Sequence, residues 1–165
     1  MMRDAGYWIK NLNLLPHPEG GYYKETYRST EEINSNSLSN IFKGNRAYST
    51  AIYFLLEKGN FSAFHRIKSD EIWHFYDGDP ILIHVINNNG KLITHELGLE
   101  PQHGIIPQIT VPANTWFASE SKGNFSLAGC TVSPGFDFND FEMADRNTLT
   151  KLYEQHHLII KQFTR

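Results

Sequence analysis

Short runs of apolar residues, separated by turn-forming residues, dominate the chain from Tyr48 onward. Breaks rich in Gly, Pro, Asn and Asp interrupt these runs, as in the segment 77–80. Regularly spaced short runs of this kind are typical of the strands of a sandwich, a jelly roll or a closed barrel. The predicted strands are 48–56, 61–67, 71–76, 81–86, 91–97, 105–111, 115–119 and 125–132.

The two ends of the chain have a different pattern. Apolar residues recur at helical spacing within 4–15, and an alternating run over 22–28 predicts one further strand. The Ser- and Asn-rich stretch 29–45 predicts a long polar loop, either a mobile lid or a disordered excursion. Helical spacing returns after residue 140. We therefore expect one all-β domain over residues 1–165, flanked by short N- and C-terminal helices.

Composition and charge exclude several classes of protein. The 165 residues include 15 basic and 18 acidic side chains, a net charge of −3, without a basic block, so we expect no nucleic-acid partner. No apolar run approaches the roughly 20 residues of a membrane helix, so we expect no membrane partner. The first ten residues lack the apolar core of a secretory signal, and the single Cys130 cannot form an intramolecular disulfide. These features predict a cytoplasmic protein.

Two segments have the spacing of a metal-binding barrel. The first is 59–78, GNFSAFHRIKSDEIWHFYDG, which contains His65 and Glu71, and the second is 112–117, PANTWF. Their spacing resembles the two signatures of the cupin superfamily. In that family a His-x-His pair, a Glu and a later His hold a metal inside a small β-barrel.

Two of the four ligand positions implied by this resemblance are apolar here. Ile67 stands at the second His of the pair, and Phe117 stands at the last His. Asn114 stands where the signature has a turn glycine, and asparagine also tolerates the left-handed backbone conformation of such a turn. Catalytic transition-metal sites use at least three protein ligands. The sequence therefore predicts no tight metal site and no cofactor.

Five separated blocks extend the resemblance along nearly the whole chain. They are HPEGGYYKETYRS, STAIYFLL, FHRIKSDEIWHFYDGDP, VPANTWFAS and GCTVSPGFDFNDFEMA. Together they resemble the uncharacterised Cupin_5 family. The resemblance implies a cupin jelly-roll (double-stranded β-helix) barrel, a homodimer and a buried pocket for a small-molecule ligand, without an established reaction. The architecture is also similar to the metal-free dTDP-sugar epimerases of rhamnose biosynthesis, although their motifs are not visible in this chain.

Alternation along two strands predicts which side chains face the interior. Residues two apart share a face, so His65 lies with Ile67, and Glu71 begins the inner face of the next strand. We expect His65 and Glu71 to be catalytic and close enough to interact. A core histidine bound to a backbone group, and a structural carboxylate paired with His65 or Arg46, are the alternatives. The predicted pocket walls are Ile67, Trp73, Phe75, Trp116 and Phe117, although aromatic residues in a barrel are usually core.

Other polar residues are assigned to less specific roles. His17 and Glu19 could reach a pocket mouth, but exposed loop positions are the default expectation. We expect His74 to face outward, His156 and His157 to be solvated, and Cys130 to be an inert buried thiol.

Three functions are compatible with this sequence. The first is a metal-independent isomerase or epimerase that acts on a sugar or sugar nucleotide, with His65 as the base and Glu71 as its partner or second acid/base. The second is a non-catalytic binding or sensing module for a small polar metabolite. The third is a metal-dependent oxygenase or isomerase that uses His65, Glu71 and an unrecognised ligand.

Overall fold

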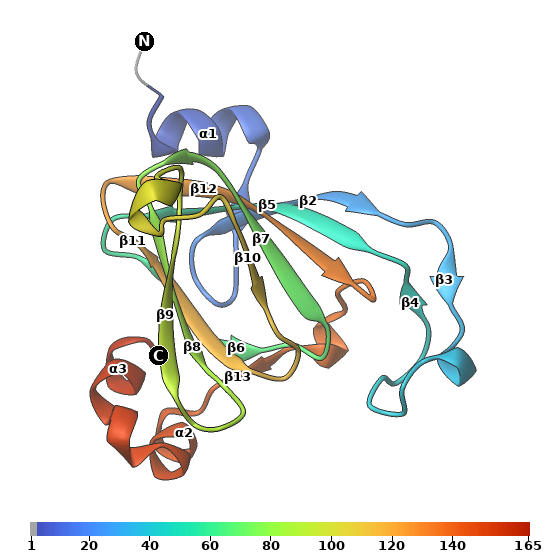
Figure 1. The fold of residues 1–165 in the computed structure, drawn as a ribbon. Helices are drawn as coiled ribbons and strands as arrows, with labels where there is room; N and C mark the ends of the chain where they lie inside the picture. The colour runs from blue at the N-terminus through green and yellow to red at the C-terminus, as the bar shows by residue number, and fades with distance from the viewer. Residues whose placement is uncertain (1–2) are drawn as a thin grey trace.

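The computed structural model describes residues 3–165 and has two antiparallel sheets packed face to face as a jelly-roll barrel (Figure 1). This confirms the predicted all-β barrel with short helices at both ends. The first sheet has the strand order β1-β2-β5-β12-β7-β10, and the second has the order β13-β6-β11-β8-β9. The strands are β1 (Leu15–Pro16), β2 (Tyr22–Arg28), β5 (Thr50–Glu57), β6 (Phe61–Arg66), β7 (Asp70–Gly78), β8 (Ile81–Ile86), β9 (Leu92–Leu97), β10 (Gln108–Val111), β11 (Trp116–Ser121), β12 (Phe125–Ser133) and β13 (Glu142–Met143).

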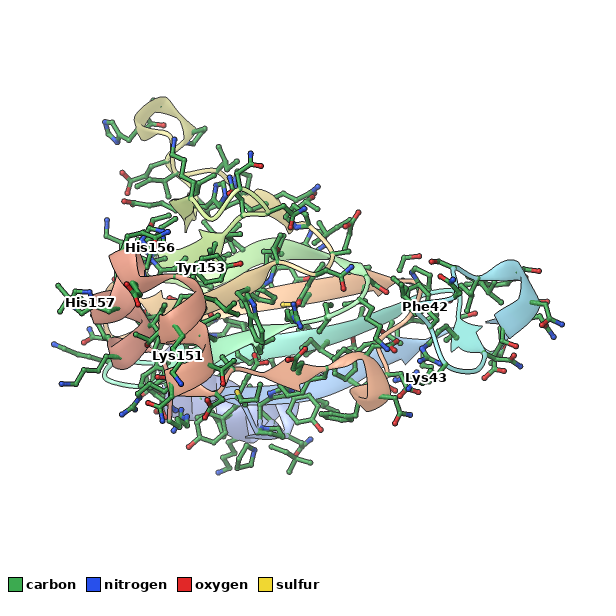
Figure 2. The ribbon with its side chains drawn as sticks, turned by 90° about the horizontal axis from the view of Figure 1, so that it is seen from below. Phe42, Lys43, Lys151, Tyr153, His156 and His157 are labelled. Atoms are coloured by element: carbon green, nitrogen blue, oxygen red, sulfur yellow. The ribbon has the colours of Figure 1, made fainter. Side chains whose placement is uncertain are left out.

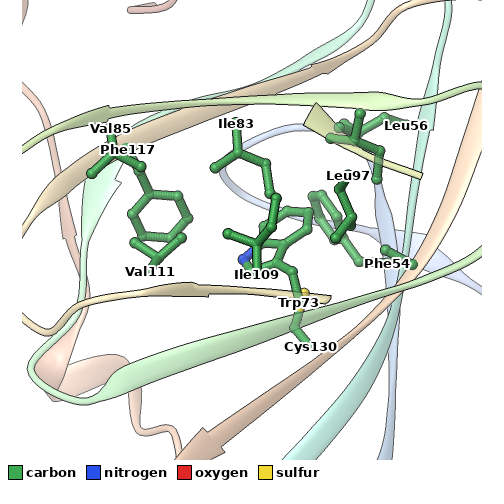
Figure 3. Close-up of a cluster of buried hydrophobic side chains, with 12 residues drawn as sticks. Phe54, Leu56, Trp73, Ile83, Val85, Leu97, Ile109, Val111, Phe117 and Cys130 are labelled. Atoms are coloured by element: carbon green, nitrogen blue, oxygen red, sulfur yellow. The ribbon is translucent and has the colours of Figure 1, made fainter. Parts of the chain in front are cut away.

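Inward-facing apolar residues of both sheets fill most of the barrel (Figure 3). Trp73 of β7 lies at the centre of this cluster, with its ring edge-to-face against Phe54 and Phe117. The burial of such large side chains is the main stabilising contribution of a fold of this size. The other buried members are Leu56, Ile81, Ile83, Val85, Leu97, Ile109, Val111, Ala128 and Cys130. We call this cluster the dry core.

Three helices cover the outer faces of the sheets. Helix α1 (Ala5–Leu12) begins at Asp4, whose side chain accepts a hydrogen bond from Tyr7 N, and it packs over the first sheet. Helices α2 (Arg146–Leu152) and α3 (His157–Gln162) cover the second sheet and bury a separate cluster around Phe64. No helix within residues 3–165 is long and apolar enough to cross a membrane.

Most of the stretch 29–45 lacks regular structure, as predicted for a loop, but residues 29–47 form an arm that contains two short paired strands. Strands β3 (Glu32–Ile33) and β4 (Arg46–Ala47) pair with each other, and a 3-10 turn, η1 (Ser35–Ser37), lies between them. Figure 2 shows the arm, labelled at Phe42 and Lys43, projecting from the barrel opposite the C-terminal helices. A buried ion pair holds the base of the arm, because Arg46 Nε lies 2.6 Å from Asp140 Oδ2.

Candidate functional site

A cavity of about 500 Å³ opens at one end of the barrel, beside the dry core. The first half of β5 and the last residues of β12 contribute to its wall, while the remaining halves of these strands contribute to the core. The loops 17–19 and 136–141 complete it. The lining residues are His17, Glu19, Tyr23, Glu25, Arg28, Thr50, Ile52, His65, Ile67, Glu71, Cys130, Val132, Phe136, Asp137, Phe138 and Phe141.

His65 lies on this wall with both ring nitrogens engaged. Nδ1 lies 2.7 Å from the carbonyl oxygen of Ala63, and Nε2 lies 3.1 Å from Glu19 Oε2. Because a carbonyl oxygen only accepts, Nδ1 must hold a proton and donate it to Ala63. The backbone contact expected for a structural histidine is therefore present, together with a carboxyl partner on the other side of the ring.

Burial favours the neutral forms of both His65 and Glu19. Burial lowers the pKa of His65 to about 3, and burial, with a smaller contribution from the nearby Glu71 charge, raises the pKa of Glu19 well above its usual range. Glu19 Oε2 therefore holds a proton and donates it to His65 Nε2, while Glu19 Oε1 accepts from the Ser62 hydroxyl at 2.9 Å. Burial therefore favours an O–H···N contact between two neutral groups over an ion pair.

Glu71 lies on the same cavity wall but has a different partner. The Cys130 thiol of the neighbouring strand β12 lowers the pKa of the Glu71 carboxyl by less than burial raises it. Burial raises the pKa of Glu71 to about 7, and it raises the pKa of Cys130 as well. Cys130 is buried and free, as expected, and Glu71 is a carboxyl that can exchange a proton near neutral pH.

The prediction that Glu71 contacts His65 is wrong, because Glu19 occupies that position. Both residues line one cavity, as the strand register predicted, but no hydrogen bond or ion pair joins them in the described part of the chain. Glu19 takes the expected position of Glu71 beside the imidazole. Arg46, the other partner suggested for Glu71, binds Asp140 instead.

A glycine turn brings Glu19 into the barrel from a segment expected to be exposed. Gly20 and Gly21 have φ of 114° and 74°, a region that L side chains rarely adopt. A Cβ on Gly20 would lie 2.0 Å from the carbonyl oxygen of Phe61, so only glycine allows this close approach. The turn presses residue 19 against β6, where the Ala63 amide donates to the Glu19 carbonyl oxygen at 2.8 Å.

The other loop residues close the side of the cavity. His17 Nδ1 accepts a hydrogen bond from the Glu19 amide at 3.3 Å, and burial lowers the pKa of His17 to about 4. Its ring stacks with the ring of Phe138, with centroids 6.3 Å apart. His17 and Glu19 therefore both belong to the site, and the expectation that they are exposed loop residues was wrong.

Arg28 ties the mouth of the cavity together. Its guanidinium binds both carboxylate oxygens of Glu25, at 3.1 and 2.7 Å, and also donates to the Phe136 carbonyl oxygen. Arg28 and Glu25 are each more than 40% exposed, so this cation faces solvent at the rim. Simple alternation along the strand 22–28 places residues 25 and 28 on opposite faces, so the sequence pattern did not predict this pair. A register shift between Glu25 and Tyr27 brings the two side chains together.

Of the predicted pocket walls, only Ile67 lines the cavity. Trp73 and Phe117 are buried in the dry core, and Phe75 packs against it. Trp116 lies in the cluster beneath the C-terminal helices, where the Arg66 guanidinium sits 4.4 Å from its ring centroid. The aromatic wall consists instead of Phe136, Phe138 and Phe141, which follow β12.

The histidines expected outside the site make local contacts. His74 lies 3.2 Å from the Thr131 hydroxyl, on the outward side of β7. His156 and His157 bind the carbonyl oxygens of Gly90 and Glu154.

The metal site implied by the resemblance does not fit these residues. Ile67 and Phe117 stand at two of its positions and offer no donor atom. The Phe117 ring instead packs 4.1 Å from the His65 ring, centroid to centroid. His65 itself uses one nitrogen for Ala63 and the other for Glu19. Asn114, at the turn before Phe117, has φ of 60°, as predicted.

Comparisons with known proteins identify similar chains. An uncharacterized protein from Saccharomyces cerevisiae, YML079W, is 31% identical over 143 residues, covering 80% of this chain and 71% of the yeast protein. Two solved structures cover nearly the whole chain. A Shewanella oneidensis protein has 39% identity, a TM-score of 0.90 and coverage of 99% of both chains. A hypothetical protein from Leishmania major has 36% identity, a TM-score of 0.89 and coverage of 98% of this chain and 99% of that one.

A more distant likeness concerns the fold alone. Oxalate decarboxylase from Bacillus subtilis is 12% identical, with a TM-score of 0.56 over 90% of this chain and 36% of that one. The family model described as "Cupin superfamily (DUF985)" matches residues 6–144, which include every residue of the cavity. The chain therefore belongs to the Cupin_5 family of the cupin superfamily.

Proposed function

We propose that this protein binds a small polar metabolite in the cavity and acts on it as a metal-independent isomerase or epimerase of a sugar or sugar nucleotide. One observation supports this most strongly. Two buried carboxyls, Glu19 and Glu71, and the His65 imidazole share the wall of a cavity large enough for a monosaccharide-sized ligand. Groups with pKa values shifted by burial inside a cavity are typical of catalytic acids and bases.

Glu71 is the group best suited to move a proton. With a pKa of about 7, its carboxylate and its carboxylic acid are both populated at neutral pH. A general base or acid is most effective when its pKa lies near the working pH. In this proposal Glu71 removes a proton from a carbon next to a carbonyl and returns it to the other face or to the neighbouring carbon.

The Glu19–His65 pair supplies the second proton-transfer group. Glu19 holds its proton against His65 Nε2, and a charge that develops on the ligand can be met by movement of that proton. His65 thus acts through Glu19, which modifies the role that the sequence suggested. Ser62, bound to the other Glu19 oxygen, fixes the orientation of the carboxyl.

The second candidate is a binding or sensing module without catalysis. The observation that favours it is the full engagement of the His65 ring by Ala63 and Glu19. In that case the pair only shapes the wall of the cavity. A metal-dependent activity has less support, because two of the implied ligand positions are apolar.

Solvent hydrogen exchange separates catalysis from binding without knowledge of the product. The protein is incubated in D₂O with a panel of aldoses, ketoses and sugar nucleotides, and loss of C–H signals is followed by NMR. We expect exchange at one carbon next to a carbonyl, reduced at least about 100-fold in Glu71→Gln, the typical contribution of a general acid or base. Ser69→Ala, a change outside the cavity, is the matched control.

The exchange experiment also has a clear negative outcome. A panel member that binds in the cavity but exchanges no C–H would contradict the enzyme proposal and favour the binding module. A native mass spectrum of the purified protein narrows the panel, because a co-purifying metabolite gives a mass above 19.0 kDa per chain.

We also propose that two copies associate through β2. Within the described residues, β1 pairs with only Tyr22 and Tyr23, so the outer edge of residues 24–28 has no strand partner. Open edges of this kind favour pairing with another chain. Sedimentation at micromolar concentration should show a dimer, and a single species of 19.0 kDa would contradict it. A reducing, cytoplasmic location is proposed on the free thiol of Cys130.

A further inference from the structure

We infer that the floor of the cavity accepts neutral or positively charged groups and rejects anions, so that any carboxylate or phosphate of the ligand stays at Arg28. The floor is defined as Glu19, His65, Glu71 and Cys130, and the mouth as Glu25, Arg28 and Asp137. This inference rests on the proposed ligand cavity and specifies the chemical class of the ligand.

The charged residues that line the cavity are mostly acidic. Four carboxyl groups and one permanent cation contribute to the wall. The carboxyls are Glu19, Glu25, Glu71 and Asp137, and the cation is Arg28. No lysine or arginine is among the floor residues. Even with Glu19 and Glu71 both protonated, the lining has two carboxylates against one guanidinium, so its net charge is not positive.

Arg28, the one permanent cation of the lining, lies at the mouth of the cavity. Arg28 binds both oxygens of Glu25 and the carbonyl oxygen of Phe136, and its side chain is 44% exposed. These contacts hold the guanidinium at the rim. An anionic substituent of the ligand at the mouth could bind the Arg28 guanidinium alongside Glu25. An anion at the floor would not contact that guanidinium.

Hydrogen-bond donors are also scarce at the floor. The proton of Glu19 is directed at His65 and the Ser62 hydroxyl at Glu19, while the Cys130 thiol is only a weak donor. A buried anion needs donors or a cation to replace its lost hydration. A hydroxyl or an ammonium group needs acceptors, and Glu71 offers free lone pairs.

The aromatic wall points to the same ligand class. Phe136, Phe138 and Phe141 line the cavity. Aromatic faces attract cations and the C–H faces of sugars, but they repel anions. A neutral polyol or an amine therefore fits the wall and the floor together.

Cys130 provides a native probe of this property, because it is the only cysteine and it lies at the floor. Three methanethiosulfonate reagents differ in charge: 2-aminoethyl (cationic), 2-sulfonatoethyl (anionic) and methyl (neutral). In each case the thiolate attacks the sulfenyl sulfur, a mixed disulfide forms and methanesulfinate leaves. Mass spectrometry gives the three labelling rates, and the same rates on the urea-unfolded chain serve as the reference.

The folded protein should prefer the cationic reagent. We expect the cationic-to-anionic rate ratio to exceed that of the unfolded chain by at least about tenfold, because a fixed charge acts strongly at short range in a protein interior. Glu71→Gln should lower the ratio toward the reference. Glu31→Gln, an exposed carboxylate on the arm, is the matched control and should leave the ratio unchanged.

The labelling experiment separates failure of the charge preference from failure of the proposed ligand cavity. An anionic rate equal to or above the cationic rate, relative to the unfolded chain, would overturn this inference and leave the ligand cavity intact. Because Cys130 is 3% exposed and burial raises the pKa of its thiol, failure of the neutral methyl reagent to label folded protein moves the test to equilibrium dialysis with glucosamine and glucuronate. Tighter binding of glucuronate would overturn this inference, and binding of neither sugar would count against the proposed function as well. If Glu71→Gln does not fold, the ratio in the unaltered protein decides the question alone.

Discussion

The two halves of the barrel are built from the same strands but hold opposite chemistry. Strand β7 crosses both, with Glu71 in the cavity and Trp73, two residues further along the same face, in the dry core. Strand β5 changes in the same way between Ile52 and Phe54. The dry half contains large buried apolar side chains, whereas carboxyls and imidazoles line the open space of the cavity half.

The difference shows how one barrel can tolerate a costly polar site. Buried carboxyls and neutral imidazoles do not stabilise a fold unless they are hydrogen-bonded. At the cavity end, Glu19, His65 and Ser62 satisfy one another. We infer that the dry half supplies most of the stability, while the cavity half is shaped by ligand chemistry.

The largest expected effect comes from breaking the dry half. Trp73→Ala removes a side chain that is 1% exposed and touches Phe54 and Phe117. We expect the free energy of unfolding to fall by about 3–5 kcal/mol, the usual cost of truncating a large buried aromatic residue. Urea unfolding followed by circular dichroism measures this change.

Phe138→Ala is the matched control from the cavity half. Phe138 is 54% exposed, so we expect a loss of less than about 1 kcal/mol. Equal losses for the two variants would show that stability is not concentrated in the dry half.

A smaller, pH-dependent effect is expected from Glu71→Gln. The pKa of Glu71 is about 7 in the folded protein and near 4.5 when exposed, so the folded state binds its proton more tightly. The free energy of unfolding contributed by this group therefore falls as pH rises from about 4.5 to about 7. Glutamine cannot ionise, so the variant should gain stability relative to the unaltered protein over that range, by up to about 3 kcal/mol.

The opposite pH dependence of the histidines cancels in this comparison. His65 and His17 have lowered pKa values, so their contribution to stability rises with pH up to about 6.5, but both are present in the two proteins. Denaturant unfolding at several values from pH 5 to pH 8 gives the difference. A difference that stays constant with pH would mean that Glu71 titrates like an exposed carboxyl.

The sequence predicted the barrel and its strand register better than the extent of the cavity, for a physical reason. Strand alternation and turn residues depend on local geometry, so the barrel, the register of His65 and Glu71, and the left-handed Asn114 followed from the pattern. Alternation also places Trp73 inward, but it cannot say how far along the barrel the cavity extends. Trp73 was therefore predicted as a pocket wall and lies in the core.

Two misplaced site residues, His17 and Glu19, come from a loop whose position depends on distant contacts. Glu19 reaches His65 because two glycines allow a close approach to Phe61, a contact between segments more than 40 residues apart. The glycine pair was visible in the sequence, but its partner was not. The arm built from residues 29–47 is a similar case, because its base is fixed by Asp140, far along the chain.

The smallest expected effect is that of metal removal. A cation that bound only the folded protein would stabilise it, and a chelator would then lower the melting temperature. Ile67 and Phe117 supply no ligand atoms, and both nitrogens of His65 are engaged by Ala63 and Glu19. We therefore expect no shift in melting temperature with chelator, and far less than one equivalent of metal by elemental analysis after mild chelation. Near-stoichiometric zinc, iron, manganese or nickel, lost together with thermal stability, would show that the cavity half holds a metal after all, and that the floor charge is set by that ion.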